Sequence, residues 1–444
     1  MSSFVRSLLA GPQRALLVGM GVTNRAVAGA LLRRGHEVVA VDDRPDDQLR
    51  EALRDLQITL VESPTAEALA TLAGECHFVV PAPGLPELHP AFALALPAIS
   101  ELDLAAAWDN RPIAAITGTN GKTTVVELCI ASLTCAGIRA VAAGNTDIPL
   151  VAAIDQPDVE VFVVEASSFR LASVRDFAPA VGTWLNFAED HLDVHHDLAS
   201  YEQAKARVFS TLAPGGIAIA NVMDPVVMRH VPSDREVVTF GGSEADYRVD
   251  GDKLLGPGGP FMTTDRMWRS LPHDIEDLLA AAATVAALGT SLSAVAAAAE
   301  AFVGLPHRVS PIGEIDGSTY FNDSKSTTPH ATVAALRGFE SVVLIAGGRN
   351  KGVDLTELLG GADHVRAVVA IGDAADEVAA VFDDSRTVVR AASMDEAVAA
   401  ARTLSVGGHP VLLSPACASF DWYRNYGERG NDFVRAVEDA GASQ

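Results

Sequence analysis

The sequence predicts an α/β protein of three domains. Its 444 residues exceed the usual size of one domain. Short apolar runs alternate along the chain with Ala- and Leu-rich helical stretches, as in open parallel sheets. Glycine-rich turns follow two of these runs. We therefore expect a Rossmann-like N-terminal domain over 1–107, a central P-loop domain with a doubly wound, mostly parallel sheet over 108–305, and a Rossmann-like C-terminal domain over 306–444.

Composition narrows the possible partners. Hydrophobic residues make up 49% of the chain, enough for several buried cores, and the formal net charge of −24 disfavours nucleic acids and anionic membranes. The four cysteines are scattered without metal-binding spacing, so free thiols in a reducing compartment are expected. Residues 1–13 lack a signal-peptide pattern, and the apolar stretch 278–289 is too short to span a bilayer. These features predict a cytoplasmic protein.

The first domain opens with a buried strand that enters a Gly19-Met20-Gly21 turn and an Ala-rich helix. A second strand, 37–41, ends at Asp42 and Asp43, about 20 residues after the turn, where a ribose-binding acid is expected. Asn24 stands where the third glycine of G-x-G-x-x-G belongs, which disfavours an ordinary NAD site. The pattern favours a nucleotide-type site, although a tight turn in any α/β unit has the same start.

A glycine-rich loop opens the central domain. Residues Gly118, Thr119, Asn120, Gly121, Lys122, Thr123 and Thr124 follow the apolar run 113–116 and precede a helical pattern that begins near Val125. Backbone amides and a helix N-terminus in this context hold a polyphosphate. Lys122 is expected to reach the outer phosphates and Thr123 to bind Mg²⁺. Ile116 replaces the first glycine of the usual motif.

Polar groups follow the next strands of this domain. Glu165 ends the run 161–164, where a carboxylate beside a phosphate loop is placed to hold Mg²⁺. His191 lies in a polar cluster after the run 180–185, which favours a metal ligand over a buried structural histidine. Residues 201–209 form a helical pattern, in which spacing alone predicts that Lys205 is an exposed surface lysine. Residues 241–264 read as a short β excursion.

The third domain follows a linker at 304–308 and has strands at 342–346, 367–371 and 410–413. Residues 322–329 are dense in charged and hydroxyl side chains. Arg308 and Lys351 add cations near loops. Each group alone is compatible with a solvated loop, but together they indicate one wall of a phosphate and carboxylate site.

With these motifs in place, the chain resembles the Mur ligases over essentially its whole length. The motifs that carry the resemblance occur in the order of that family, at 118–124, 165–169, 190–193, 204–207, 305–308, 322–325 and 414–421. The resemblance implies three domains, which agrees with the segments above. It also implies an ATP-dependent ligase that uses ATP and Mg²⁺, with two metal ions and a carbamylated lysine.

The resemblance assigns roles to individual residues. The uridine and diphosphate are expected at Val22, Thr23, Asp42, Asp43 and Gly84. The ATP phosphates are expected at 118–124, and the metals at Thr123, Glu165, His191 and the carbamate of Lys205. Lys122, Lys205, His191 and Glu165 form the implied catalytic set. The remaining implied contacts are Asn145 and Ser167 for the UDP-sugar, His307, Arg308 and Asp323 for adenosine, and Lys325, Thr327, Lys351, Ser419 and Tyr426 for the incoming amino acid.

The resemblance is strongest to the branch that joins D-glutamate to UDP-N-acetylmuramoyl-L-alanine in peptidoglycan synthesis, and it implies a monomer. L-glutamate, another amino acid, or the related folylpolyglutamate synthase reaction are alternatives. A non-catalytic paralogue is a further alternative, which the intact Lys122, Glu165, His191 and Lys205 disfavour. A simple P-loop kinase is disfavoured because it would not need the two flanking domains.

The chain departs from the family pattern at a few positions. Asp147 replaces a glycine and Arg170 a glutamine, and we hypothesise that the two side chains form a compensating ion pair. Asp274 and Asp277 stand where many relatives have asparagines near the adenine, and an aspartate cannot donate to the base. Thr328 also replaces a common asparagine.

Overall fold

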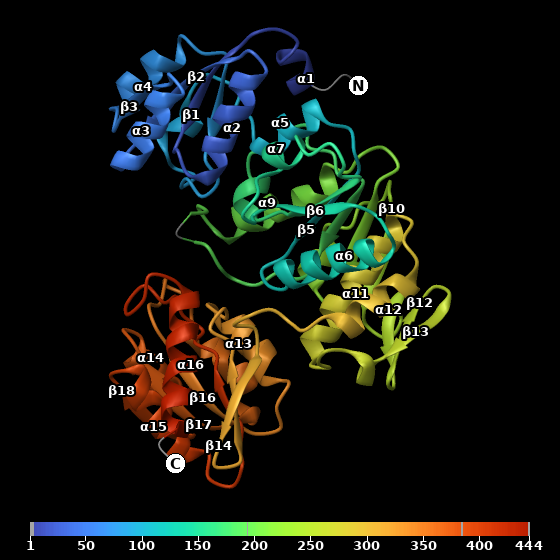
Figure 1. Ribbon diagram of the computed structural model, residues 1–444, viewed down its shortest axis with the longest axis vertical. Coiled ribbons are helices and arrows are strands. Elements are labelled where there is room, and N and C mark those ends of the chain that lie inside the picture. Colours follow the sequence, from blue (N-terminus) through green and yellow to red (C-terminus); the bar gives the residue numbers. More distant parts are fainter. Residues whose placement is uncertain (1–3, 193, 383–384, 443–444) are drawn as a thin grey trace. The chain divides into compact units, whose positions relative to one another are not determined.

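The computed structural model describes residues 4–192, 194–382 and 385–442. The chain divides into two compact units. The first comprises 1–187, 191–266 and 277–301, and the second 188–190, 267–276 and 302–444. The strands form three sheets, two in the first unit and one in the second (Figure 1).

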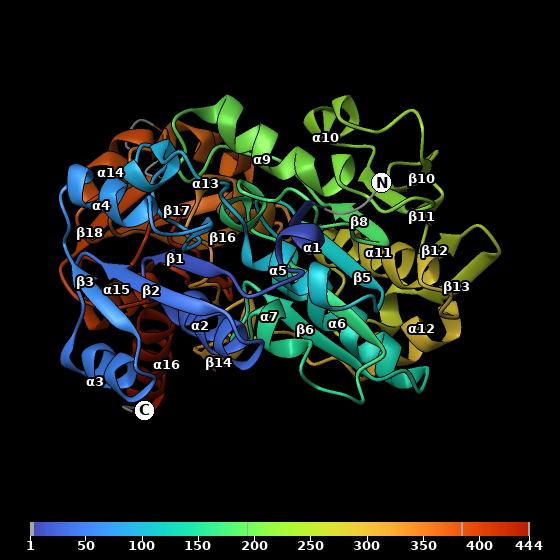
Figure 2. The ribbon, with the colours of Figure 1, turned by 90° about the horizontal axis from the view of Figure 1, so that it is seen from above.

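The first sheet has four parallel strands in the order β3-β2-β1-β4. Their bounds are β1 Arg14–Val18, β2 Glu37–Asp42, β3 Thr59–Glu62 and β4 Phe78–Pro81. Near-continuous apolar runs make β1, β2 and β4, because the inner strands of a parallel sheet are covered on both faces, whereas β3 at the edge is only partly buried. The accompanying helices are α1 Phe4–Leu8, α2 Val22–Arg33, α3 Asp47–Asp55, α4 Ala66–Ala73 and α5 Glu101–Trp108, with a 3₁₀ segment at Pro90–Ala93. Figure 2 shows α2 alongside the strands β1 and β2.

The second sheet has nine strands in the order β13-β12-β11-β10-β9-β8-β5-β7-β6. It is parallel from β6 to β11, and β12 and β13 add an antiparallel edge, which is the β excursion expected from the sequence. The strand bounds are β5 Ile113–Thr117, β6 Ala140–Gly144, β7 Val161–Glu165, β8 Val181–Trp184, β9 Ile217–Asn221, β10 Glu236–Gly241, β11 Tyr247–Asp250, β12 Lys253–Gly256 and β13 Gly259–Thr263.

Helices cover this second sheet. Helix α6 buries positions three or four residues apart, among them Val125, Leu128, Cys129 and Leu133, so one apolar face lies against the sheet. It begins at Lys122, earlier than the Val125 expected, because Gly121 takes the N-cap position. The other helices are α7 Leu150–Ala153, α8 Ser168–Leu171, α9 Leu198–Ser210, α10 Pro225–Arg229, α11 Pro272–Ala287 and α12 Leu292–Ala301, with a 3₁₀ segment at Thr264–Arg266.

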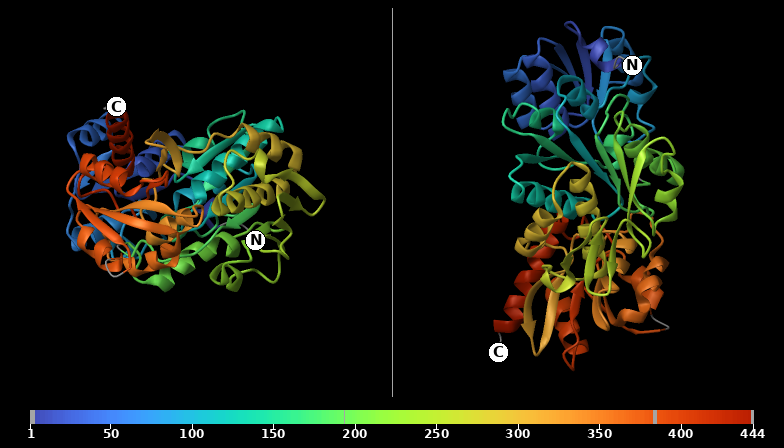
Figure 3. Two further views of the ribbon diagram at one scale, coloured as in Figure 1. Left: turned by 90° about the horizontal axis from the view of Figure 1, so that it is seen from below. Right: turned by 90° about the vertical axis from the view of Figure 1, so that its right-hand side faces the viewer.

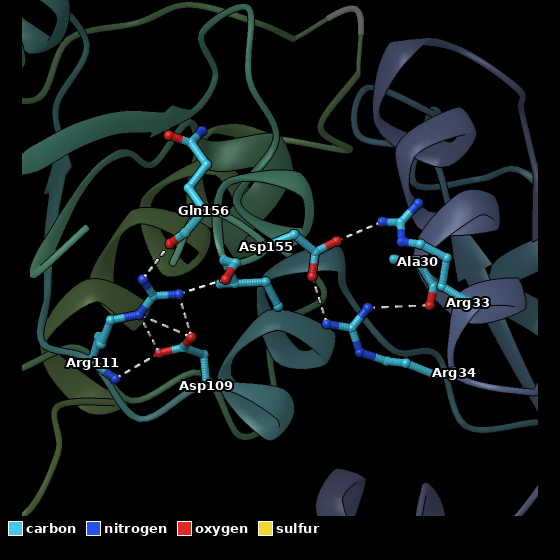
Figure 4. A network of polar contacts seen from close by, with 8 residues as sticks. Ala30, Arg33, Arg34, Asp109, Arg111, Asp155 and Gln156 are labelled. Atoms are coloured by element: carbon cyan, nitrogen blue, oxygen red, sulfur yellow. Dashed lines mark hydrogen bonds and ion pairs between the residues drawn. The ribbon is translucent and has the colours of Figure 1, made fainter. Parts of the chain in front are cut away.

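An arginine-rich contact joins helix α2 to the turn after α7. The Asp155 carboxylate accepts from Arg33 at 2.6 Å and from Arg34 at 2.8 Å (Figure 4). Arg111 holds the other side of this turn through the carbonyl oxygens of Gln156 at 2.7 Å and Val159 at 2.9 Å. The first and second sheets also share one hydrophobic cluster, so both belong to one compact unit.

The third sheet has the order β14-β15-β19-β16-β17-β18, with only the β14–β15 pair antiparallel. Figure 3 shows this sheet, in orange, from two further sides, and α16 packs against β14. The strands are β14 Ser310–Ile315, β15 Ser318–Asn322, β16 Val342–Gly347, β17 Val365–Ile371, β18 Thr387–Ala391 and β19 Val411–Leu413. The helices are α13 Pro329–Leu336, α14 Ala375–Phe382, α15 Met394–Leu404 and α16 Tyr426–Ala442, with a 3₁₀ segment at Leu355–His364.

No helix in the described ranges is long and apolar enough to cross a membrane.

Candidate functional site

The phosphate-type loop forms where the sequence places it, between β5 and α6 (Figure 1). Strand β5 is buried throughout, and Ile116 lies inside the sheet opposite Glu165 and Thr183. The motif position at which the first glycine is usual is therefore part of strand β5 in this chain, and the loop starts at Gly118. The ammonium of Lys122 donates to the carbonyl oxygens of Gly118 and Thr119, each at 2.8 Å. These bonds hold the lysine beside the loop.

Asn186, at the end of β8, braces this loop. Its Oδ1 accepts from the amides of Thr119 at 3.0 Å and Asn120 at 2.9 Å, and its backbone carbonyl accepts from the Thr119 amide at 3.1 Å. Sequence reasoning did not select this residue. The signal was available, because an amide side chain at the carboxyl end of a parallel strand adjacent to β5 lies at the same edge as the loop.

The glycines of the loop are required by its conformation. Gly121 has φ +84, and a Cβ added there would lie 2.5 Å from Oδ1 of Asp277. Asp277, on α11, is therefore packed directly against the backbone of the loop. Gly118 leaves only 2.9 Å for a Cβ beside Leu185. Side chains at these positions would push the loop away from the sheet.

Lys205 is buried against the loop, so the surface lysine expected from spacing alone is wrong. It is 1% exposed, and its Nζ donates to the Gly118 carbonyl at 2.6 Å. The ammonium lies 4.6 Å from the ring centroid of Tyr201, whose hydroxyl is 3.1 Å from Thr119 Oγ1. Helix α9 buries Tyr201, Lys205 and Val208 on one face, and that face packs on the sheet. The resemblance, unlike the spacing, placed Lys205 in the site.

Glu165 and His191 occupy the expected strand ends. Glu165 is buried at the end of β7, and its Oε1 accepts from Asn145 Nδ2 at 2.9 Å. The His191 ring lies 4.6 Å from Phe169 and 6.0 Å from Tyr201. Among the residues the structure describes, no group of three or more His, Cys, Asp or Glu side chains is placed to hold a metal ion. Asp193, in the same motif, lies outside the described residues.

A buried chain of polar groups that the sequence did not indicate runs beside His191. His195 Nε2 lies 2.9 Å from Ser168 Oγ, and its Nδ1 lies 2.7 Å from Glu87 Oε1. Burial favours the neutral form of Glu87, but hydrogen bonds from the His196 amide and the His195 ring lower its pKa below the usual value. The loop after β4 thus contacts the loop that carries His191.

The glycine turn after β1 is held by Asn24. Its Nδ2 donates to the carbonyl oxygens of Val18, Gly19 and Val80 at 3.2, 2.9 and 3.1 Å. The residue that replaces the third glycine therefore ties β1 and β4 together at the turn. Asp42 Oδ2 accepts from the Met20 amide at 2.7 Å. The strand-end acid thus also supports the turn.

The other residues expected at this first site lie on nearby segments. Val22 is exposed at the start of α2, and Gly84, with φ +87, lies in the turn after β4. Asp43 is mostly exposed, 3.6 Å from His89 Nε2.

Arg170 does not pair with Asp147, so the hypothesised ion pair is wrong. Its guanidinium instead donates to Glu101 Oε2 at 2.9 Å and to Thr23 Oγ1 at 3.0 Å. All three of these residues are buried, whereas Asp147 is exposed. Burial raises the pKa of the Glu101 carboxyl, and the Arg170 charge opposes that shift. In the same turn as Arg170, Ser167 Oγ is buried and has no hydrogen-bond partner within the described ranges.

In the second unit, Asp323 anchors the linker before β14. Its Oδ1 accepts from the Val309 amide at 3.2 Å, and its Oδ2 accepts from Ser326 at 2.6 Å and Ser414 at 2.7 Å. Burial raises the pKa of Asp323 to about 6, although the serine hydroxyls oppose the shift. His307 adopts φ +60, and burial lowers its pKa.

Asp274 is engaged by an arginine. Arg269 binds its carboxylate through two bonds, at 2.6 and 2.7 Å, and donates to the Arg308 carbonyl at 2.9 Å. Asp274 therefore holds the start of α11 to the linker.

The residues expected to bind the amino acid gather around Arg429, which sequence reasoning missed. This buried arginine on α16 donates to Ser324 Oγ at 3.0 Å and O at 2.9 Å, and to the Cys417 carbonyl at 3.0 Å. It thus fixes the loops that carry Lys325, Thr327 and Ser419. Lys325 Nζ lies 5.4 Å from the Tyr426 ring, and Lys351 Nζ lies 6.0 Å from the Phe420 ring. Thr328 caps α13 through the Ala331 amide at 3.4 Å.

Comparison with known proteins agrees with this arrangement. Residues 116–255 match the Mur ligase middle domain, and 307–417 match the Mur ligase, glutamate ligase domain. The chain is 37% identical to a UDP-N-acetylmuramoylalanine–D-glutamate ligase of Methylococcus capsulatus, covering 98% of this chain and 96% of that protein. It is 39% identical to one of Frankia casuarinae, covering 95% and 93%.

Solved structures share the fold. A pseudomurein peptide ligase type C of Methanothermus fervidus has a TM-score of 0.61 at 17% identity, covering 96% of this chain and 99% of that one. UDP-N-acetylmuramate–alanine ligase MurC of Thermotoga maritima has a TM-score of 0.57 at 17% identity, covering 96% and 100%. The two relatives that are 37% and 39% identical over nearly the whole chain, together with the two matching domain models, show that the chain belongs to the Mur ligase family.

Proposed function

We propose that this enzyme uses ATP to join D-glutamate to UDP-N-acetylmuramoyl-L-alanine, forming ADP and phosphate in peptidoglycan precursor synthesis. One observation carries the proposal. The buried Lys205 and the loop 118–124 form one cluster, in a chain with near full-length similarity to D-glutamate ligases of that name.

The chemistry explains why a phosphate loop is needed. A carboxylate is a poor electrophile, so the γ-phosphoryl group of ATP first passes to the alanine carboxylate oxygen and ADP leaves. The glutamate amine then attacks the carbonyl carbon, the carbon–oxygen bond to phosphate breaks, and the amine loses a proton. Lys122 is held at the loop by two carbonyl oxygens and is positioned to neutralise charge on the transferred group. Exclusion of water protects the acyl phosphate from hydrolysis.

Enzymes of this family use ATP with Mg²⁺. Oxygen donors that suit Mg²⁺ lie close to the loop, namely the Thr123 hydroxyl at the start of α6 and the buried Glu165 carboxylate at the end of the neighbouring β7. Thr123, Glu165 and His191 would hold two Mg²⁺ ions. Bound there, Mg²⁺ withdraws charge from the phosphoryl oxygens. Asn145 orients the Glu165 carboxylate from the side.

Lys205 would add a carboxylate to this site if carbamylated. Its Nζ lies 2.6 Å from the loop carbonyl of Gly118, so a carbamate on this nitrogen would lie beside the loop. Lys205→Ala should lose activity that bicarbonate does not restore, whereas a short carboxylate such as formate restores part of it. Wild-type turnover by the variant would contradict the assignment. Carbon-13 NMR after incubation with labelled bicarbonate reports the carbamate directly.

The remaining site residues keep their proposed roles. Val22, Thr23, Asp42, Asp43 and Gly84 serve the uridine and diphosphate, and Asn145 and Ser167 the sugar. Adenosine is assigned to His307, Arg308 and Asp323, of which Asp323 acts by anchoring the linker. The proposed pocket for glutamate consists of Lys325, Thr327, Lys351, Ser419 and Tyr426. Its two lysines suit a substrate that brings two carboxylates. We further propose a cytoplasmic monomer.

The experiment that tests the proposal is phosphate release from ATP with UDP-N-acetylmuramoyl-L-alanine and D-glutamate, L-glutamate or no amino acid. Release that depends on D-glutamate supports it. Release with L-glutamate alone contradicts the proposed acceptor, and release with neither contradicts the proposed activity.

A further inference from the structure

The buried triad Glu101–Arg170–Thr23 places a guanidinium against the start of α2. Arg170 Nη1 donates to Glu101 Oε2 at 2.9 Å, and Nη2 donates to Thr23 Oγ1 at 3.0 Å. Glu101 is held in turn by the Val151 amide, which donates to Oε1 at 2.9 Å. Each of the three side chains is at least nine-tenths buried. The guanidinium is therefore fixed from both sides.

This arrangement controls the direction in which the Thr23 hydroxyl donates. Because Thr23 Oγ1 accepts from Arg170, its own hydrogen must point elsewhere, where it can meet an acceptor. The positive charge behind the oxygen also makes the hydroxyl a stronger donor. Thr23 lies in the first turn of α2, whose N-cap Gly21 supplies no side-chain cap. The start of a helix and a hydroxyl whose hydrogen is left to donate both favour a negatively charged ligand.

A second observation points to a ligand here. Arg170 Nε and Ser167 Oγ are both buried, and neither has a hydrogen-bond partner among the residues that the structure describes. A buried polar group without a partner destabilises the folded state, because it has lost its hydrogen bonds to water. Two such groups in one turn, beside the start of α2, are expected where a polar ligand completes the network.

We propose that Arg170 is a positioning residue for the diphosphate of the nucleotide substrate, acting through the Thr23 hydroxyl and held in place by Glu101. This inference rests on the proposed function, since it deepens the UDP site of the same reaction. It also gives Arg170 a role other than pairing with Asp147. The uridine itself does not need this charge, so the effect is confined to ligands that carry the phosphates.

The test compares the binding of uridine and UDP by calorimetry in wild type and in the double variant Glu101→Gln/Arg170→Gln. The double variant removes both buried charges and keeps similar volumes, so no unpaired charge is left inside. We expect UDP affinity to fall at least about tenfold, the loss of one charge-assisted hydrogen bond, while uridine affinity stays within about twofold. The KM for UDP-N-acetylmuramoyl-L-alanine should rise by the same factor, with kcat little changed.

Asp155→Asn is the matched control. It weakens a different arginine–carboxylate contact, between the end of α2 and the turn after α7, without touching Thr23 (Figure 4). Thr23→Val provides a second variant of similar shape, which should show the same selective loss of UDP affinity.

Three results would overturn the inference: equal loss of uridine and UDP affinity in the double variant, unchanged UDP affinity, or the same selective loss in Asp155→Asn. A wild-type chain that binds no UDP would overturn the proposed function as well, which separates the two failures.

Discussion

Replacing Asn186 by alanine removes the side chain that accepts the Thr119 and Asn120 amides of the phosphate-type loop. The Thr119 amide keeps its second acceptor, the backbone carbonyl of residue 186. Two hydrogen bonds are therefore lost without compensation, the one from the Asn120 amide and the one that Asn186 Nδ2 donates to the Asn120 carbonyl at 3.3 Å. With about 0.5–1.5 kcal/mol for each hydrogen bond, the loss is about 1–3 kcal/mol. If the wild-type loop is preformed for ATP, this loss appears as an affinity about 5- to 150-fold weaker.

The assay is calorimetric titration of ATP with Mg²⁺ into folded protein, with circular dichroism to verify the fold. Asp246→Ala is the control, because it removes two comparable hydrogen bonds to the amide and hydroxyl of Thr239, between β10 and β11. That variant should lose similar stability and keep its ATP affinity. Equal ATP affinity in Asn186→Ala and wild type would refute the reasoning that Asn186 preforms the loop.

Three more changes test other parts of the site. Gly121→Ala places a side chain at φ +84 and against Asp277, so ATP-dependent phosphate release should be lost. Gly137→Ala is the control, because it has a similar φ of +77 and open space around the added Cβ; it should cost about 1–2 kcal/mol of stability and retain activity. Arg429→Lys cannot donate to Ser324 and Cys417 together, so the KM for D-glutamate should rise about tenfold with ATP binding unchanged; an unaltered KM would contradict this. Burial raises the pKa of Asp323 to about 6, so the folded state binds the proton of this carboxyl more tightly than the unfolded state does. As pH rises from about 4 to 6, the free energy of unfolding of the wild-type protein therefore falls by up to about 1.4 kcal/mol per pH unit. The melting temperature of Asp323→Asn relative to wild type should therefore rise over that window, and a constant difference would show that the carboxyl does not titrate there.

Local features of the sequence were enough to predict an α/β architecture of open, mostly parallel sheets, most of the central strands and the phosphate-type loop. Parallel strands buried on both faces read as short apolar runs, and the loop needs glycines at a strand–helix junction. Edge strands such as β3 Thr59–Glu62 and β14 Ser310–Ile315 were missed, because they are only partly buried and lack a continuous apolar run.

Only the tertiary structure decided which polar residues, far apart in the chain, contact one another. Spacing within α9 made Lys205 an exposed lysine, and the packing of that helix on the sheet buried it against Gly118, 87 residues away. Arg170 likewise pairs with Glu101 rather than the nearer Asp147, across 69 residues. A lysine or arginine carries no local sign of burial, because the partners that make its burial possible, here the Gly118 carbonyl and the Glu101 carboxylate, come from distant segments. The sequence by itself determined which elements form and which loops carry chemistry, and the folded sheets decided which side chains meet.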